Sequence, residues 1–227
     1  VPVARRLMQR GLMPSAAVTF MLAAPVLNPV VIASTFVAFR GRTTLWTMVG
    51  GRFLLGMLVA IAVGWVIGNR SKDELLKPNP EEAHEHLLEL GRPEARWRRF
   101  FVHLGNDFLF MGRFLLLGAT IAAAIQTFLP TSVLTGLAER PVVSVLAMMG
   151  LAAALSLCSE SDAFVAASFV QFGPSAMLGF LVFGPMVDLK LVALYAGTFR
   201  RGFTRTVVLV AAAATLVGAL WVGVAFG

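Results

Sequence analysis

The sequence predicts an all-α, polytopic membrane protein built from two inverted repeats, with broken mid-membrane helices and re-entrant segments. Three observations lead to this fold class: an apolar composition, a series of long apolar windows, and a motif that returns after 160 residues. Apolar residues make up 58% of the 227 positions and charged residues 14%, with a mean hydropathy of +0.81, whereas soluble chains carry about 25% charged residues. This composition excludes disordered, collagen-like and coiled-coil chains, and one cysteine cannot form an internal disulfide.

Long apolar windows divide the chain into spans. A helix needs about 20 apolar residues to cross the roughly 30 Å of bilayer hydrocarbon. The windows of sufficient length are 14–39, 44–68, 104–129, 174–199 and 206–226, and a further run at 141–157 is marginal. We therefore divide the chain into the C-terminal part of a first transmembrane repeat (1–68), a charged cytoplasmic loop (69–103) and a second transmembrane repeat (104–227).

The loop 69–103 is the one soluble-looking stretch. It holds seven of the twelve acidic residues, seven of the nineteen basic residues and all three histidines. Prolines and glycines flank a short amphipathic helix that we expect from Glu81 to Leu90. His84 and His86 project from different faces of such a helix, so a solvated charged loop is favoured over a metal site. No metal or other cofactor is predicted.

A motif in the first half returns 160 residues later. Aligning 14–40 with 174–200 gives eight identities over 27 ungapped positions, including Pro25 with Pro185 and the closing Phe-Arg pair. Paired prolines at equal spacing indicate a duplication. If the second unit starts near His103, the same shift places the start of the first unit more than fifty residues before Val1. We therefore expect the start of the first repeat to be missing here.

Two topologies are compatible with a duplication, and charge separates them. If 141–157 crosses the membrane, the units are parallel; if 141–157 and 161–172 form a re-entrant pair, they are inverted. Cytoplasmic loops are rich in Lys and Arg. The inverted arrangement gathers on one face the basic residues of 69–103 with Arg5, Arg6, Arg10, Arg200, Arg201 and Arg205, and leaves Arg40, Arg42 and Arg140 on the other. The charge bias therefore favours the inverted arrangement. The net charge of +7 therefore indicates topology and lipid contact, and no nucleic-acid partner.

Broken helices in both units are candidates for a solute pathway. The runs Ala24–Pro29 and Gly184–Lys190 place prolines halfway along apolar spans, and proline frees backbone carbonyls there. Such groups are tolerated at membrane depth only when buried in protein or lining a cavity. The alternative is that Pro25 and Pro185 are packing kinks and that Asn28 caps a half-helix.

The second candidate is the polar run Cys158–Asp162, which we expect at the tip of the re-entrant pair. It offers a carboxylate that can respond to protons beside a soft thiol, and thiolates prefer soft metals and metalloids. Ser161 or Asp162 could instead simply cap the following helix. The predicted substrate pathway consists of Pro25, Asn28, Cys158, Ser159, Ser161, Asp162, Pro185, Asp188 and Lys190.

Other features are weaker indications. Arg52, Asp107 and Arg113 are charges in or near spans, where a charge is a site hypothesis by default. The small-residue stripe of Gly56, Ala60, Gly64 and Gly68 permits close helix packing, within the chain or in a homo-oligomer. Catalytic triads, phosphate-binding glycine loops and two-histidine zinc spacings are absent from the sequence. We therefore predict that the protein is not an enzyme.

The runs Ala24–Val31, Cys158–Phe169 and Phe183–Lys190 together resemble the bacterial predicted-permease family that includes the ArsP-type organoarsenical efflux permeases. The resemblance covers essentially the whole chain. It implies a polytopic inner-membrane permease, and some relatives export trivalent organoarsenicals through cysteine coordination. In those relatives a short cysteine motif lies just upstream of the segment matching Val1, outside this sequence.

We therefore predict a secondary transporter that moves a small solute, with an organoarsenical or another soft metalloid compound as a candidate for efflux. Alternating access would rock one repeat against the other, and protonation of Asp162 or Asp188 would couple export to the proton gradient. The alternative is a channel-like or non-transporting component of a membrane assembly.

Overall fold

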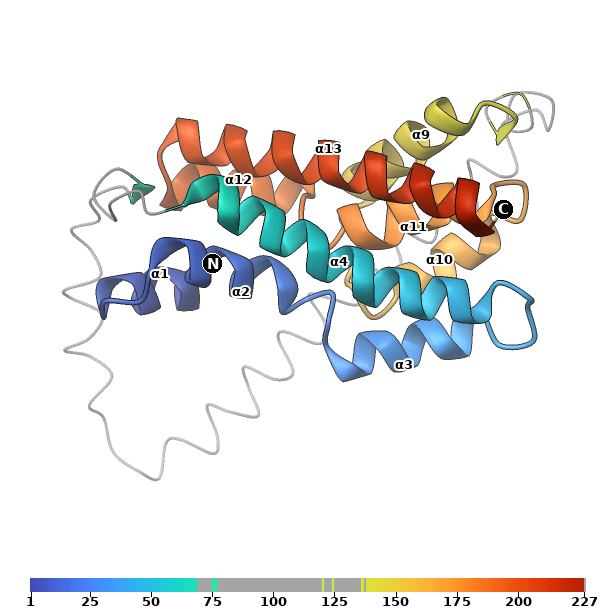
Figure 1. The fold of residues 1–227 in the computed structure, drawn as a ribbon, viewed down its shortest axis with the longest axis horizontal. Helices are drawn as coiled ribbons and strands as arrows, with labels where there is room; N and C mark the ends of the chain where they lie inside the picture. Colours follow the sequence, from blue (N-terminus) through green and yellow to red (C-terminus); the bar gives the residue numbers. More distant parts are fainter. Residues whose placement is uncertain (69–74, 77–119, 121–123, 125–135, 137, 227) are drawn as a thin grey trace.

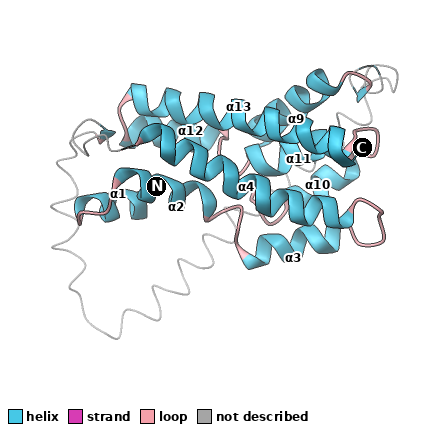
Figure 2. Ribbon diagram, viewed as in Figure 1, coloured by secondary structure: helices cyan, strands magenta, loops and turns pink. Residues whose placement is uncertain are grey.

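The computed structural model describes residues 1–68, 75, 76, 120, 124, 136 and 138–226. Their regular elements are helices joined by loops, with one isolated bridge between Leu76 and Phe199 (Figure 2). The window 104–129, the expected helix Glu81–Leu90, the histidines, Asp107 and Arg113 lie outside the described residues. The helices are α1 (Pro2–Gln9), α2 (Pro14–Ala23), α3 (Pro29–Ala38), α4 (Leu45–Ile67), α9 (Pro141–Leu155), α10 (Asp162–Ser168), α11 (Pro174–Phe183), α12 (Leu189–Thr198) and α13 (Arg201–Phe226).

Two of the predicted spans are each broken into two helices of equal length. The first gives α2 and α3 and the second gives α11 and α12, and each has 10 residues. The bounds of α2 and α3 map onto those of α11 and α12 by the same shift of 160 residues that aligns the sequences. The breaks, residues 24–28 and 184–188, follow the same sequence of turns and bends. The helix interruptions predicted from the prolines are therefore confirmed at both places.

The long helices α4 and α13 pack against each other and run in opposite directions along the molecule (Figure 1). Their contact is close, since a Cβ on Gly218 would lie 2.1 Å from Cδ1 of Leu55. Both are long and apolar enough to cross a membrane. Trp46 and Trp65, near the two ends of α4, are exposed, as expected for side chains at membrane interfaces.

The small-residue stripe of α4 brings this helix against α2 and against the break that follows α2. A Cβ on Gly64 would lie 2.0 Å from Oγ1 of Thr19, and one on Gly56 would lie 2.5 Å from Cγ1 of Val26. Any larger side chain at these two positions would push the helices apart. The packing function predicted for the stripe is confirmed within the chain at Gly56 and Gly64.

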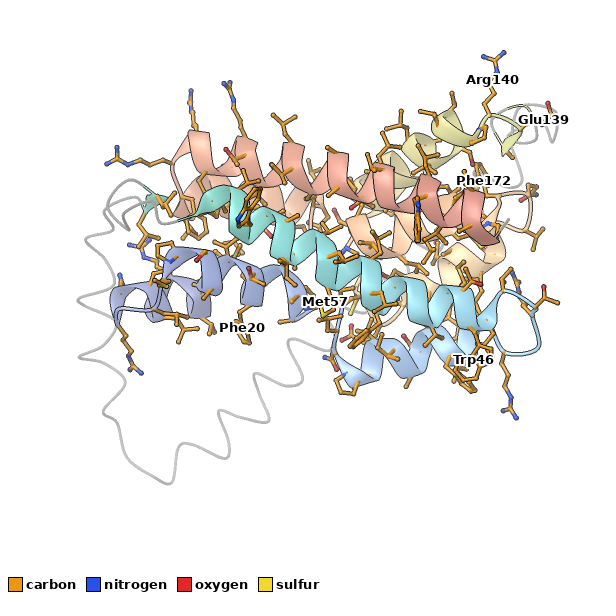
Figure 3. The ribbon with its side chains drawn as sticks, in the orientation of Figure 1. Phe20, Trp46, Met57, Glu139, Arg140 and Phe172 are labelled. Carbon is orange, nitrogen blue, oxygen red and sulfur yellow. The ribbon has the colours of Figure 1, made fainter. Side chains whose placement is uncertain are left out.

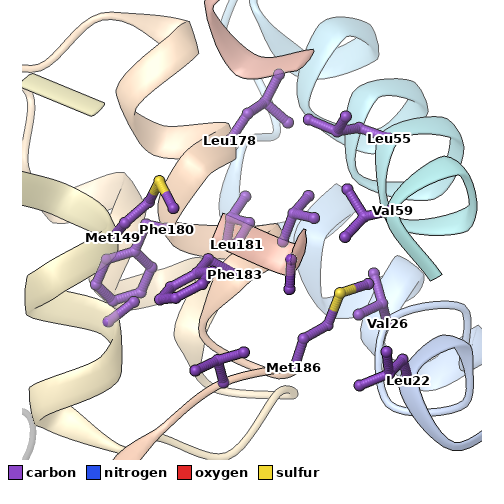
Figure 4. Close-up of a cluster of buried hydrophobic side chains, with 14 of the residues drawn as sticks. Leu22, Val26, Leu55, Val59, Met149, Leu178, Phe180, Leu181, Phe183 and Met186 are labelled. Carbon is purple, nitrogen blue, oxygen red and sulfur yellow. The ribbon is translucent and has the colours of Figure 1, made fainter. Parts of the chain in front are cut away.

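The core lies around α11, whose residues 176–183 are all buried. Helix α11 contacts α9, α13 and α4. Val26 and Met186 occupy the same position in the two breaks and are both fully buried, and Figure 4 shows Met186 extending toward Val26. The two breaks therefore meet in the interior.

Apart from the two breaks and the loop before α10, the described loops lie at the two ends of the molecule (Figure 1). At one end, the backbone N–H of Arg200 donates to the carbonyl of Leu75 at 2.9 Å, so the start of the charged loop lies beside the start of α13. Figure 3 shows Arg140 and Trp46 at the other end. Arg140 lies directly before α9, and Trp46 lies in the first turn of α4. Arg140 therefore lies far from Leu75 and the start of α13.

Candidate functional site

A cavity of about 460 Å³ lies where the two breaks and the loop before α10 meet. From the first unit it is lined by Met21 and Pro25, beside Val1. From the second unit it is lined by Leu157, Cys158, Ser159, Glu160, Pro185, Asp188, Lys190, Leu191 and Tyr195. The cavity therefore takes its wall from both halves of the chain. We call residues 157–160 the cavity wall loop.

The structure brings six of the nine predicted pathway residues together in this cavity. They are Pro25, Cys158, Ser159, Pro185, Asp188 and Lys190. The other three, Asn28, Ser161 and Asp162, are not among the residues that line it. Their side chains instead make contacts within the protein.

Asn28 and Asp188 occupy matching positions at the starts of α3 and α12. Oδ1 of Asn28 accepts a hydrogen bond from the N–H of Val30 at 2.9 Å, and Oδ1 of Asp188 accepts one from the N–H of Leu191 at 2.6 Å. Each side chain therefore satisfies a backbone donor that the break has exposed. The alternative that Asn28 caps a half-helix is confirmed, and Asp188 does the same while it also lines the cavity.

The cavity wall loop is held by its own hydrogen bonds. The Cys158 thiol donates to the Glu160 carboxylate, and the Ser161 hydroxyl donates to the Cys158 carbonyl at 3.0 Å. Ser161 precedes α10 but makes no side-chain bond to the helix N-terminus. Of the alternative in which Ser161 or Asp162 caps this helix, the part that concerns Ser161 is therefore wrong, because its hydroxyl bonds to the preceding turn.

Asp162 forms an ion pair with Arg52 of α4. The two guanidinium nitrogens Nη1 and Nη2 approach Oδ1 and Oδ2 of Asp162 at 2.8 and 2.7 Å. Arg52 is 0% and Asp162 3% exposed. The sequence marked Arg52 only as a charge inside a span, and its isolation in an otherwise apolar window was the available signal. A bidentate pair of this kind has a fixed geometry.

Tyr195 is a cavity residue that the sequence analysis missed. It is 2% exposed, and its hydroxyl donates to the carbonyl of Met186 in the second break at 3.0 Å. Asp188, Leu191 and Tyr195 are spaced by three and four residues, which places them on one face of a helix. This spacing, with the sole tyrosine of the sequence, was the signal that could have found it.

Among the residues that the structure describes, no group of three or more His, Cys, Asp and Glu side chains could hold a metal ion. The cavity offers instead one thiol, two carboxylates and one amine, from Cys158, Glu160, Asp188 and Lys190. Such a set can orient a small polar or soft solute.

Exposed apolar helices, two broken helix pairs and a cavity lined by ionisable side chains are features typical of helical membrane proteins of the transport type. The chain belongs to the ArsP_1 predicted permease family, whose model matches residues 1–223.

Two relatives are similar along most of the chain. One is "UPF0718 protein YcgR" of Bacillus subtilis, 38% identical over 98% of this chain and 74% of its own length. The other is "Putative two-component membrane permease complex subunit" of Streptococcus mutans, 32% identical over 89% of this chain and 67% of its own length. No solved structure matches the chain significantly.

Proposed function

We propose that this permease is a secondary transporter that binds a small solute in the cavity between its two broken helices and carries it across the bacterial inner membrane. The observation that carries the proposal is the cavity itself, which joins both breaks to the cavity wall loop. Its volume of about 460 Å³ lies in the range of about 300–1,000 Å³ common for small-molecule sites. Discontinuous helices that meet at mid-membrane are a common way to build transporter sites.

Two inverted repeats would supply the alternating access. The equal shift of the helix bounds, the opposite directions of α4 and α13 and the meeting of Val26 with Met186 support this arrangement. The length of α9 supports a re-entrant position, since 15 residues extend only about 22 Å at 1.5 Å per residue, less than the hydrocarbon thickness. We therefore propose that α9 and α10 enter and leave the membrane on one side.

The charge distribution supports a cytoplasmic position for the loop 69–103. The hydrogen bond between Arg200 and Leu75 brings Leu75 beside the basic start of α13, whereas Arg140 lies at the opposite end (Figure 3). With basic residues favoured on the cytoplasmic side, the end that carries α13's first turn would face the cytoplasm.

The substrate we propose to test first is a trivalent organoarsenical. The resemblance to ArsP-type permeases suggests it, and the Cys158 thiol on the cavity wall offers a soft ligand beside a carboxylate that can accept its proton. Asp188 also lines the cavity, so its protonation would be the step that couples export to the proton gradient. Asp162 is less suited to this step, because Arg52 occupies both of its oxygens.

The test is uptake into everted vesicles that contain the full-length protein, with trivalent methylarsenical and a panel of soft-metal and organic solutes. We expect saturable uptake that Cys158→Ser abolishes for the arsenical. The matched control moves the thiol to α13 as Cys158→Ser with Thr206→Cys, because Thr206 bonds within its own helix. Uptake retained in Cys158→Ser would contradict thiol coordination of the solute.

A second candidate is a component of a membrane assembly, because the Streptococcus mutans relative is named as a complex subunit. The same vesicles separate the candidates. Flux that rises linearly with solute concentration would favour a channel. A folded, inserted protein that moves none of the solutes would favour an assembly component. A homo-oligomer also stays a prediction, and the Gly56–Gly64 part of the stripe is already used within the chain.

A further inference from the structure

One buried arginine of the first unit connects three segments behind the cavity. Arg52 lies in the first half of α4, seven residues after its start at Leu45, and is fully buried. Besides its paired contact with Asp162, its Nη1 donates to Oγ1 of Thr35 at 2.9 Å and its Nη2 donates to the carbonyl of Ser159 at 3.1 Å. The Thr35 hydroxyl can accept this bond because its own proton goes to the carbonyl of Val31 at 2.8 Å. One guanidinium therefore joins α3, α10 and the cavity wall loop.

The contact with Ser159 matters because this residue lines the cavity. Ser159 lies between Cys158 and Glu160, which also line it. Arg52 itself is not among the lining residues. It therefore holds the backbone of the wall from behind, while Asp162 fixes the orientation of the guanidinium through two bonds.

A second arginine of the first unit holds the far end of α10. Nη2 of Arg42 donates to the carbonyl of Ala167 at 2.8 Å, one residue before the end of the helix. Helix α10 is thus attached to the first unit at its first turn by Arg52 and at its last turn by Arg42. The position of the cavity wall loop relative to the first unit depends on these contacts.

Stability alone does not explain a charge pair in this place. A buried ion pair is often no more stabilising than two well-packed apolar side chains of similar volume, although removing one partner is strongly destabilising. A charge within a membrane span is also expensive and usually has a function. The directed hydrogen bond to the Ser159 carbonyl is what an apolar pair could not provide.

We propose that Arg52 is a positioning residue of the transport site: through Asp162 and the Ser159 carbonyl, it fixes the cavity wall loop that presents Cys158 to the solute. The proposal rests on the proposed function for its transport consequence, and its structural part is tested without any transported solute. Cys158 is the sole cysteine of the sequence and serves as a native reporter of the loop.

The experiment measures the rate at which N-ethylmaleimide labels Cys158 in the intact, purified protein, with any cysteine outside these residues replaced. The variants are Arg52→Lys, which keeps the charge but loses the planar fork, and the apolar pair Arg52→Met with Asp162→Leu. The matched control is Arg140→Met, because Arg140 is an exposed arginine at the start of α9. Melting temperatures of all variants are measured in the same detergent.

We expect the apolar pair to melt near the wild-type temperature and to label about tenfold faster, a factor that corresponds to one lost hydrogen bond to a charged group. Arg52→Lys should label at an intermediate rate and Arg140→Met at the wild-type rate. For any transported solute, KM should rise by the same order while the maximal rate changes less, because the wall is displaced and the rest of the cavity remains.

An apolar pair that folds and labels at the wild-type rate would overturn the proposal and leave the ion pair a packing feature. If the apolar pair does not fold, the labelling rate of Arg52→Lys tests the proposal instead. A wild-type rate in that variant would also overturn the proposal. Faster labelling together with no transport of any solute would retain the positioning role and reject the proposed transport function. The two failures are thereby distinguishable.

Discussion

The two breaks, 24–28 and 184–188, share a backbone path but differ in chemistry. Both separate helices of 10 residues, and both place a capping side chain at the start of the second helix. In the first break the cap is the neutral Asn28, followed by Pro29; in the second it is Asp188, followed by Leu189 and Lys190. Asp188 and Lys190 line the cavity, whereas Asn28 does not.

The two breaks separate the need to cap a helix start from the need for a charge in the cavity. Either an amide or a carboxylate can accept the exposed backbone N–H, so capping alone does not explain a charge in the second break. A charge within a membrane span is costly unless it is used or paired. The four predictions below run from the largest expected effect to the smallest, and three of them pair a change in one half with its counterpart in the other.

The largest effect is expected on stability, from substituting a glycine where α4 or α13 contacts α2 or α11. Gly64→Ala should lower the free energy of unfolding by about 2–3 kcal/mol, because its Cβ would lie 2.0 Å from Oγ1 of Thr19 and 2.9 Å from the carbonyl of Ser15. Thermal unfolding in detergent measures the change.

The counterpart is Gly223→Ala in α13, whose Cβ would meet only the side chain of Ser175, at 2.9 Å. This variant should remain within about 1 kcal/mol of wild type, since the better helix propensity of alanine offsets the contact. Equal losses in the two variants would contradict a tighter first unit.

The next effect concerns charge in the breaks. Asp188→Asn keeps a capping oxygen but removes the carboxylate, so transport should fall by about tenfold or more, which is about 1.4 kcal/mol, with little change in melting temperature. Asn28→Asp should change transport less than about twofold, because Asn28 does not line the cavity. Vesicle uptake measures both, and full activity of Asp188→Asn would remove Asp188 from the proposed coupling step.

Removal of the first cap should have a smaller effect. Asn28→Ala leaves the N–H of Val30 without its side-chain acceptor and should lower the free energy of unfolding by about 1 kcal/mol. Asn28→Ser, which keeps an acceptor, is the control and should lose less. The melting temperatures in detergent give the comparison, and identical values for Ala and Ser would show that the cap contributes nothing.

The smallest effect comes from the residue after each cap. Leu189→Pro should stabilise the protein by about 0.4–1 kcal/mol, because proline at the first helical position restricts the unfolded chain. Leu189 is 71% exposed, and Asp188 before it is extended, as proline prefers. Pro29→Leu should destabilise by a similar amount. A lower melting temperature for Leu189→Pro would indicate that its backbone N–H is needed.

The sequence predicted the interruptions well because proline and its neighbours act locally. Pro25 and Pro185 interrupt their spans whatever surrounds them, since each removes a backbone donor and clashes with the preceding turn. The bounds of the two broken helix pairs therefore differ by the same 160 residues that separate the two motifs. The same local chemistry suggested the alternative in which Asn28 caps a half-helix, although Asn28 was assigned to the pathway.

The site was predicted only in part, because its assembly depends on residues far apart in the chain. Residues of both breaks and of the cavity wall loop were named, but which of them share a cavity was not predictable from spacing. Asp162 was assigned to the pathway from its polar neighbours; in the folded protein it faces Arg52, 110 positions away. Tyr195 and Glu160 line the cavity because of how α12 and the cavity wall loop pack.

The sequence by itself determined that this is a helical membrane protein with two matched, broken helix pairs, because apolar window length and proline chemistry depend on neighbouring residues alone. Tertiary structure decided which polar groups face the cavity and which pair with each other. A buried carboxylate in such a protein is used either in a pathway or in an ion pair, and the choice depends on whether a cation from another helix lies within hydrogen-bond distance. Arg52 provides that cation for Asp162, while Asp188 lines the cavity.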